Sequence, residues 1–311
     1  MSKKLKIKNS YNLFELMEMF LKYKSACGLT ERTLETYKTH FNSFKQYSDG
    51  STDMEKLKFQ ILNFLESKNN MSPYTYNTAL KELKCFFSWC VVQGYLENSP
   101  IKVLGITRKK EPYKEVSIPP EDMQKFISTI RKEYYCEYRD YVIICLMIDT
   151  GIRPAECFKL QNENVDYKNN CIMITEDVSK TNTRRFLPVS KSVISLISDL
   201  VRCIPNEWNT SLIFTSNTGT PLTSRTFSKR MKIYSNRSGV KITAYDIRHS
   251  FATQFLENNG ELFCLGKIMG HSNIRTTQRY VYSKQEFIIA QHSMATPLNK
   301  VMKNKKLVLR R

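Results

Sequence analysis

The stretch Leu265–Tyr280, LGKIMGHSNIRTTQRY, is the part of the chain on which its organisation depends. A short apolar run leads into Gly270 and His271, and Tyr280 ends the stretch after two threonines. Because glycine commonly ends helices, we expect a short buried helix over residues 261–269. The compact spacing predicts that His271 and Tyr280 act at one site, which residues from earlier in the chain complete.

The charge of the chain indicates a polyanionic partner. Its 311 residues include 48 Lys and Arg against 29 Asp and Glu, a formal net charge of +19. The parts before and after residue 111 are both basic, so the simplest explanation is a polyanion gripped by two domains. A merely solvated basic surface is the alternative, and charge alone does not separate the two. The length also favours two domains over one core.

Several classes of protein are excluded by composition. No run of eighteen uncharged apolar residues occurs, so we expect no membrane span. The basic N-terminus lacks an apolar signal core, which favours a cytoplasmic protein. The nine cysteines are scattered, which indicates reduced, buried thiols, and the histidines have no zinc spacing with them. We therefore expect neither a metal nor a cofactor.

Residues 1–104 predict an all-helical domain of four or five helices. Apolar residues recur at helical spacing in 11–26 and 30–48, and Ser72-Pro73 opens a helix that Gly94 ends. Residues 105–117 are charged and are interpreted as a linker. Basic side chains off the apolar faces are candidate contacts to a DNA backbone, although a single lysine is usually just solvated. They are Lys22, Lys24, Lys38, Lys81, Lys84, Arg108, Lys109 and Lys110.

Residues 118–311 predict a mixed domain, so that the whole chain is mainly α-helical with a small β-sheet. Two β-like runs, 171–176 and 185–189, indicate a hairpin with Lys180 in its turn, and 213–214 predicts a further short strand.

Helices are expected at 120–133 and 138–150. Gly151 ends the second of these and Pro154 starts the next helix, so Arg153 stands at an elbow from which it can point into a cleft. A surface arginine on a turn is the plain alternative.

These residue types suit the cleavage of a phosphodiester without metal. Arginine binds two phosphate oxygens with its planar fork and keeps its charge. Lysine or histidine can give a proton to the leaving oxygen. A tyrosine phenolate can form a phosphodiester that a sugar hydroxyl later displaces, so strands can be rejoined without ATP.

The chain resembles the tyrosine recombinase (phage integrase) family over essentially its whole length, most closely the compact two-domain Xer-like, transposon and phage enzymes. The family pattern T-G-x-R-x-x-E matches 150–156. The pattern L-G-H-x-x-x-x-T-T-x-x-Y matches 269–280, with Met269 in place of leucine. The resemblance implies a helical core-binding domain followed by a catalytic domain with a small sheet.

The resemblance also implies the roles of single residues. Arg153 and Arg248 would be the two catalytic arginines, and His271 would hydrogen-bond the scissile phosphate. Tyr280 would attack that phosphate and give a 3′-phosphotyrosyl intermediate. Lys180, on the hairpin, would be the general acid for the leaving 5′ oxygen.

One departure from the family concerns the pattern H-x-x-R, which falls on Tyr245–Arg248, so that Tyr245 replaces the histidine. A phenol can donate a hydrogen bond but accepts a proton poorly at neutral pH, so we interpret Tyr245 as a donor. Glu156 is expected to be a structural carboxylate, and His249 a packed histidine.

Rival assignments exist for two positions. Tyr282 is a second candidate nucleophile, which the spacing disfavours against Tyr280. Lys168 and Lys191 compete with Lys180, and placement in the hairpin favours Lys180.

The function implied is site-specific recombination of double-stranded DNA through a Holliday junction by a homotetramer. The segment after Tyr280, with Phe287, Ile288 and Ile289, would dock into a neighbouring copy or pack on its own domain. Accessory proteins or a second recombinase are further expected partners, and no membrane is expected. Phage integration, transposon movement and chromosome dimer resolution fit equally. The alternatives are DNA relaxation of the type IB topoisomerase kind and a non-catalytic DNA-binding protein derived from a recombinase.

Overall fold

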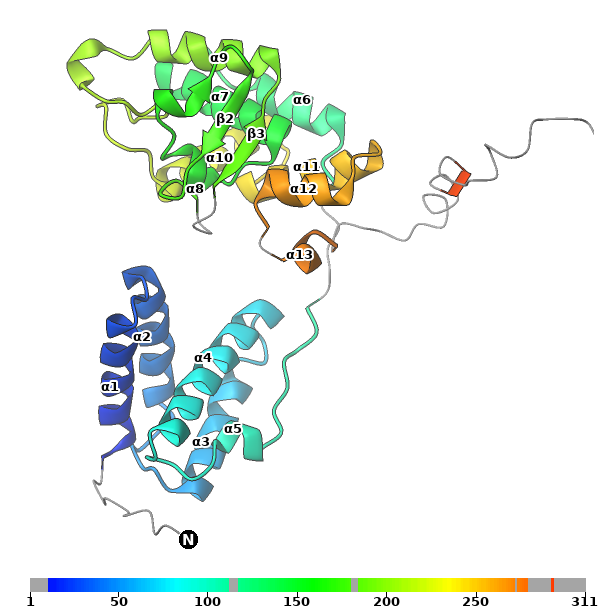
Figure 1. Cartoon of the computed structure of the whole chain (residues 1–311). Coiled ribbons are helices and arrows are strands. Elements are labelled where there is room, and N and C mark those ends of the chain that lie inside the picture. Colours follow the sequence, from blue (N-terminus) through cyan, green and yellow to red (C-terminus); the bar gives the residue numbers. More distant parts are fainter. Residues whose placement is uncertain (1–10, 112–116, 180–183, 272, 279–291, 294–311) are drawn as a thin grey trace, which may run out of the picture. The chain divides into compact units, whose positions relative to one another are not determined.

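The computed structural model describes residues 11–111, 117–179, 184–271, 273–278 and 292–293. The chain divides into two compact units, Met1–Tyr113 and Lys114–Arg311, and each has its own apolar core. The described residues are mainly helical with one small sheet, which confirms the predicted fold class (Figure 1). Across these ranges no helix is long and apolar enough to cross a membrane.

The first unit is helical throughout its described part. Its helices are α1 (Leu13–Ala26), α2 (Glu31–Lys45), α3 (Met54–Ser67), α4 (Pro73–Val92) and the short α5 (Pro100–Val103). Asn12, Asp53 and Ser72 cap α1, α3 and α4 by accepting a hydrogen bond from a backbone N–H of the first turn. The helices bury a core of aliphatic and aromatic side chains, and α1 contacts both α2 and α4 (Figure 1).

The first half of the predicted linker 105–117 is bound along α4 rather than extended into solvent. Asn77, which is 2% exposed, accepts from the backbone N–H of Lys109 (2.8 Å) and donates to its carbonyl (2.9 Å). The Lys84 ammonium donates to the carbonyl of Ile106 (2.8 Å). The segment is bound because the buried Asn77 amide can pair with both the N–H and the carbonyl of an extended residue, as a neighbouring strand would.

The second unit surrounds its core with helices and one antiparallel sheet of order β1-β2-β3. The strands are β1 (Val165–Asp166), β2 (Cys171–Ile174) and β3 (Arg185–Pro188), with Cys171 opposite Pro188 and Ile174 opposite Arg185. The helices are α6 (Pro120–Ser128), α7 (Tyr135–Thr150), α8 (Pro154–Cys157), α9 (Lys191–Arg202), α10 (Ser224–Ser238), α11 (Ala244–Glu257), α12 (Leu262–Met269) and α13 (Ile274–Gln278). Single-turn 3-10 helices span Asn162–Asn164 and Asn206–Trp208.

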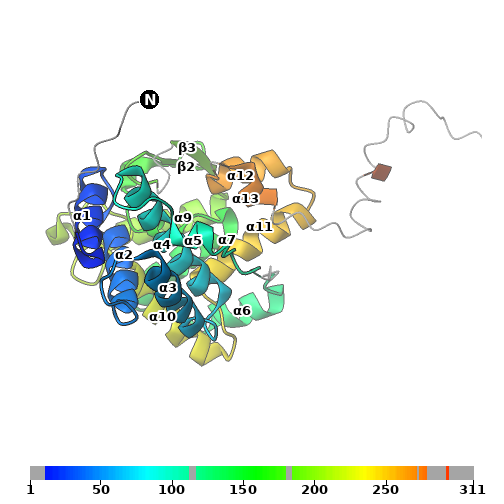
Figure 2. The ribbon, with the colours of Figure 1, turned by 90° about the horizontal axis from the view of Figure 1, so that it is seen from below.

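In the second unit, the helices that carry the sequence motifs contact one another. Helix α7 contacts both α9 and α11, and α12 contacts α11, α13 and β3. Helices α11, α12 and α13 lie side by side in both views (Figures 1 and 2).

The prediction of a short strand at 213–214 is wrong. Ile213 and Phe214 are fully buried, but only the residues beside them form bridges, Leu212 with Gln161 and Thr215 with Pro221. Apolar residues of a buried loop thus give the same short pattern as a strand.

Candidate active site

The site is built around the C-terminal end of α12. Glu261 caps the start of this helix, and Gly270 ends it in the left-handed conformation with φ +62°. The backbone N–H of His271 then donates to the carbonyl of Gly266 (3.0 Å), which closes the turn. A helix end of this kind leaves its last carbonyls without helical partners, so they are available to other donors.

Three arginines from distant parts of the chain donate to three successive carbonyls at this end. We call the carbonyls of Ile268, Met269 and Gly270 the carbonyl triad. Arg185 Nε donates to the first (2.9 Å), Arg248 Nη2 to the second (2.9 Å) and Arg153 Nη2 to the third (3.0 Å). The arrangement gathers cations at the negative end of the helix dipole, where they are stabilised.

Arg153 is held by its own helix as well as by the carbonyl triad. It precedes Pro154 at the start of α8, with extended backbone. Its backbone N–H and Nη1 both donate to the carboxylate of Glu156, at 3.2 Å and 3.0 Å. The side chain of Arg153 remains 15% exposed, so it reaches the surface of the site.

Glu156 is buried and shared between two arginines. Arg185 Nη1 and Nη2 donate to its two oxygens at 3.1 Å and 2.6 Å, and Arg153 donates to the same two oxygens. Burial alone would raise the pKa of Glu156, but the hydrogen bonds and charge of Arg185 and the charge of Arg153 outweigh it and lower the pKa. Glu156 is therefore ionised at neutral pH.

Arg248 reaches the same turn from α11. It is 5% exposed, and its Nη1 donates to the carbonyl of Gly151, the left-handed residue that ends α7. A Cβ at Gly151 would lie 2.3 Å from the Phe251 ring, so only glycine lets α11 approach this closely. Arg248 Nη2 lies 3.3 Å from His271 Nε2, which brings the second arginine beside the histidine.

The ring of His271 is oriented from its other side. Its Nδ1 and Thr277 Oγ1 are 2.8 Å apart, and Thr277 is fully buried. If Nδ1 donates to that hydroxyl, Nε2 is an acceptor facing Arg248, and the reverse tautomer makes Nε2 a donor. Thr277 thus fixes the orientation of the His271 ring and leaves Nε2 as the ring nitrogen that faces the site.

Tyr245 lies on the first turn of α11 and its side chain is 59% exposed. It precedes Arg248 by three residues, so both side chains lie on the same face of the helix. The start of α11 is fixed by Thr243 and Asp246, which cap each other, and by Ser235 of α10, whose hydroxyl pairs with both backbone groups of Ile242.

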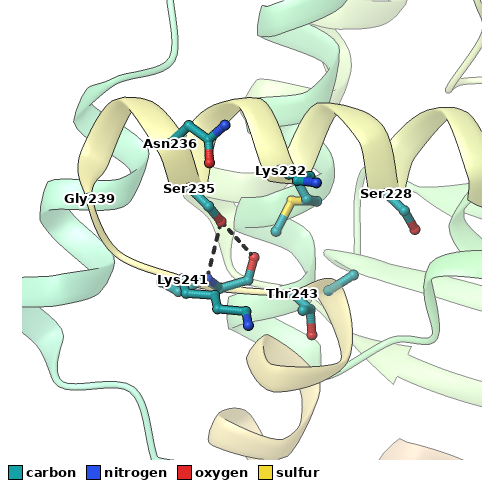
Figure 3. A pocket seen from close by; sticks show the side chains of 10 residues that line it. Ser228, Lys232, Ser235, Asn236, Gly239, Lys241 and Thr243 are labelled. Atoms are coloured by element: carbon teal, nitrogen blue, oxygen red, sulfur yellow. Dashed lines mark hydrogen bonds between the residues drawn. The ribbon is translucent and has the colours of Figure 1, made fainter.

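A pocket of the second unit lies beside this helix start (Figure 3). Lys232 and Ser228 of α10 line one side of it, and Lys241 and Thr243 line the side towards α11 (Figure 3). The pocket thus presents two lysines next to the helix that carries Tyr245.

The remaining predicted site residues fall into two groups. Lys180 and Tyr280 lie outside the described residues, as do Tyr282 and the docking segment at 287–289. Lys168 and Lys191 are described and exposed, the first in the β1–β2 turn and the second at the start of α9.

His249 is half-buried within α11. Its carbonyl accepts a hydrogen bond from the Thr253 hydroxyl (3.2 Å).

The predicted DNA-binding side chains also divide by environment. Three are half-buried and contact the protein: Lys84 bonds Ile106, Lys109 bonds Asn69 and covers the Tyr76 ring at 4.3 Å, and Lys24 covers the Phe20 ring at 5.3 Å. The exposed ones are Lys22, Lys38, Lys81, Arg108 and Lys110.

Arg185 belongs to this cluster of side chains but not to the sequence motifs. The only signal for it is indirect: Glu156 is a carboxylate in an apolar surrounding and needs cationic partners. Arg185, which begins β3 opposite Ile174 of the largely buried strand β2, supplies one of these cations.

Two arginines and a histidine thus converge on one turn, in the unit whose sequence also carries the motif that ends at Tyr280. The sequence pattern that describes the phage integrase family matches residues 117–286, and the chain belongs to that family. It is a tyrosine-type site-specific DNA recombinase.

Known relatives agree with this assignment over most of their length. The chain is 25% identical over 268 residues to the tyrosine recombinase XerD of Listeria innocua, covering 82% of this chain and 89% of the relative. It is 29% identical to the tyrosine recombinase XerC of Mannheimia succiniciproducens, covering 70% and 73%. In fold it is similar to the Tn1549 transposon integrase in complex with a circular intermediate DNA, with a TM-score of 0.75, 17% identity and coverage of 92% and 100%.

Proposed function

We propose that the chain cleaves and rejoins double-stranded DNA at a specific site through a 3′-phosphotyrosyl intermediate formed by Tyr280. The observation that carries the proposal is the convergence of Arg153, Arg248 and His271 on the turn after α12, from which the chain leads to Tyr280. The similar recombinases and the DNA-bound integrase support DNA as the substrate.

Arg153 and Arg248 neutralise the non-bridging oxygens of the scissile phosphate. Both guanidinium groups are oriented in advance by backbone carbonyls, so little reorganisation is needed when charge develops on those oxygens. With the Thr277 hydroxyl donating to Nδ1, His271 carries its proton on Nε2 and donates it to a phosphate oxygen. Tyr245 donates a further hydrogen bond from the exposed end of α11.

The reaction exchanges one phosphodiester for another. Tyr280 attacks as a phenolate, after its proton has passed to water. The phenolate oxygen forms a bond to phosphorus, the bond from phosphorus to the 5′ oxygen breaks, and Lys180 gives that oxygen its proton. Rejoining reverses these steps, with the 5′ hydroxyl of the partner strand as nucleophile. The number of phosphodiester bonds is unchanged, so no energy source is required.

The proposed assembly is a homotetramer that exchanges strands through a Holliday junction. The proposal assigns the basic residues Lys22, Lys38, Lys81, Arg108 and Lys110 to DNA backbone contacts, because their side chains are exposed. It assigns the segment with Phe287, Ile288 and Ile289 to contacts between copies. The first unit then serves as the core-binding domain and the second as the catalytic domain.

A covalent-capture experiment tests the proposal and identifies the site at the same time. The purified chain is incubated with duplexes of random sequence on both sides of a fixed nick. Cleavage near the nick releases a short fragment, so the protein remains trapped on the DNA. The expected result is an adduct that survives denaturant, holds the 5′-labelled part of the cleaved strand and yields one consensus sequence.

Two variants identify the nucleophile. Tyr280→Phe should form no adduct, and Tyr282→Phe should form it at a rate near that of the wild type. Absence of any wild-type adduct would refute the catalytic proposal, and an adduct with Tyr280→Phe would refute the nucleophile. Relaxation of supercoiled plasmids lacking the recovered sequence would favour a topoisomerase instead.

A further inference from the structure

We propose that Arg185 is a positioning residue for the cleavage reaction: it neutralises Glu156 and supports the end of α12, so that Arg153 keeps its charge for the scissile phosphate. The inference rests on the proposed function, since it assigns Arg153 to that phosphate. Arg185 belongs to none of the motifs that carry the resemblance to recombinases.

The contacts of Arg185 tie three separate segments together. Its two terminal nitrogens grip both oxygens of Glu156, and its Nε donates to the carbonyl of Ile268. Its side chain is 8% exposed, so every contact it makes here is within the protein. The residue thus fastens strand β3 to α8 and to α12 in a fixed, bidentate geometry.

The charges show why this matters for Arg153. One carboxylate, Glu156, lies between two guanidinium groups, so the cluster of three keeps a net charge of +1. Without Arg185, the buried carboxylate would have Arg153 as its neighbouring cation, and both of its oxygens would attract that side chain. Arg153 would then form a neutral pair and would neutralise phosphate less well.

The second contribution of Arg185 is to support the conformation of the turn at Gly270. A Cβ built on Gly270 would lie 3.0 Å from Arg185 Nη1 and 3.1 Å from its Cδ. The guanidinium therefore packs directly against the turn that carries the Gly270 carbonyl and leads to His271. Arg185 supports from one side the same turn that Arg153 and Arg248 hold by hydrogen bonds.

A second cluster in the same unit provides a matched control. Glu137, which is 6% exposed, binds Arg131 at 3.1 Å and Arg237 at 2.8 Å and 3.1 Å. It is again one buried carboxylate between two arginines, but within the described part of the chain neither of its partners contacts the end of α12. Arg237→Gln therefore removes one of two guanidinium groups from a buried glutamate without touching the carbonyl triad.

The test measures single-turnover cleavage of the nicked duplex recovered by covalent capture, together with DNA affinity and thermal unfolding. Arg185→Gln should bind DNA within about twofold of the wild type. It should cleave about 100-fold more slowly, the loss expected when one oxyanion donor, here Arg153, no longer neutralises the phosphate. Arg185→Lys keeps the charge but not the fork, so it should lose about tenfold. Arg237→Gln should lose thermal stability and cleave at the wild-type rate.

Two further measurements separate positioning from a merely structural role. A methylphosphonate at the scissile position has no negative charge, so the defect of Arg185→Gln should shrink to less than about tenfold on it. Adding Glu156→Gln to Arg185→Gln should speed cleavage relative to Arg185→Gln alone, because Arg153 is then no longer drawn to a carboxylate.

An undiminished defect on the methylphosphonate, or a double variant slower than Arg185→Gln, would overturn the proposal. If Arg185→Gln does not fold, the same comparison is made with Arg185→Lys and its Glu156→Gln double variant. Failure of the wild type to form any adduct is a different result, because it refutes the recombinase chemistry and not the role of Arg185.

Discussion

Replacing Gly270 by alanine should impair cleavage more than it impairs folding. The residue has φ +62°, and an L-residue in this conformation costs about 1–2 kcal/mol. For a unit of this size, that cost corresponds to a fall of about 2–8 °C in the midpoint of thermal unfolding. The added Cβ also lies 3.0 Å from Arg185 Nη1, so the guanidinium or the turn must move by a few tenths of an ångström. Because the turn carries the acceptor for Arg153 and leads to His271, cleavage should slow at least about tenfold.

Gly239 supplies the matched control. It ends α10 with φ +71°, and a Cβ there would meet nothing within 4 Å. Gly239→Ala should therefore show a similar loss of stability with cleavage near the wild-type rate. Both rates are measured on the captured nicked duplex, at a temperature where both variants are folded. Equal cleavage by Gly270→Ala and Gly239→Ala would refute the reasoning, since backbone strain would then account for everything.

Two further predictions concern Tyr245 and Glu137. Tyr245→Phe should slow single-turnover cleavage only about fivefold, the effect of one hydrogen bond of about 1 kcal/mol, and complete loss of the adduct would instead make Tyr245 a proton acceptor or an essential ligand. Burial alone would raise the pKa of Glu137, but Arg237 and Arg131 outweigh it and lower the pKa from 4.5 to about 2. A lowered pKa stabilises the fold above pH 4.5, and this contribution is lost as the pH falls towards 2. Glu137→Gln should therefore lower the free energy of unfolding at pH 7 and flatten its decline between pH 4.5 and 2, and a decline as steep as that of the wild type in urea titrations would contradict this.

The helices that carry the motifs were predictable because local sequence alone specifies them. Gly151 and Gly270 end α7 and α12 in the left-handed conformation that glycine favours, and Pro154 starts α8. These two glycines and the proline place Arg153 and His271 in the turns at the ends of helices. The assignment of residues far apart in sequence to one site came from the resemblance to tyrosine recombinases.

Interactions that depend on the backbone of a distant segment were not predictable. One contact of Arg185 is with the carbonyl of Ile268, and any residue type offers the same carbonyl, so no pattern of residues marks that contact. Asn77 is similar, since it binds both backbone groups of Lys109 and turns part of a predicted linker into a packed segment. The wrong prediction of a strand at 213–214 has a different cause: apolar residues buried in a loop give the same sequence pattern as those of a short strand.

The carbonyl triad has a consequence for how the last turn of α12 can vary in sequence. Its acceptors belong to the main chain, so a substitution at Ile268 or Met269 changes a side chain while leaving the oxygen that orients an arginine in place. Met269 itself stands where the family pattern has leucine, and it is fully buried in an apolar cluster that either side chain can fill. Other apolar side chains of similar size should therefore be tolerated at these two positions, whereas at Gly270 the backbone conformation itself must be preserved.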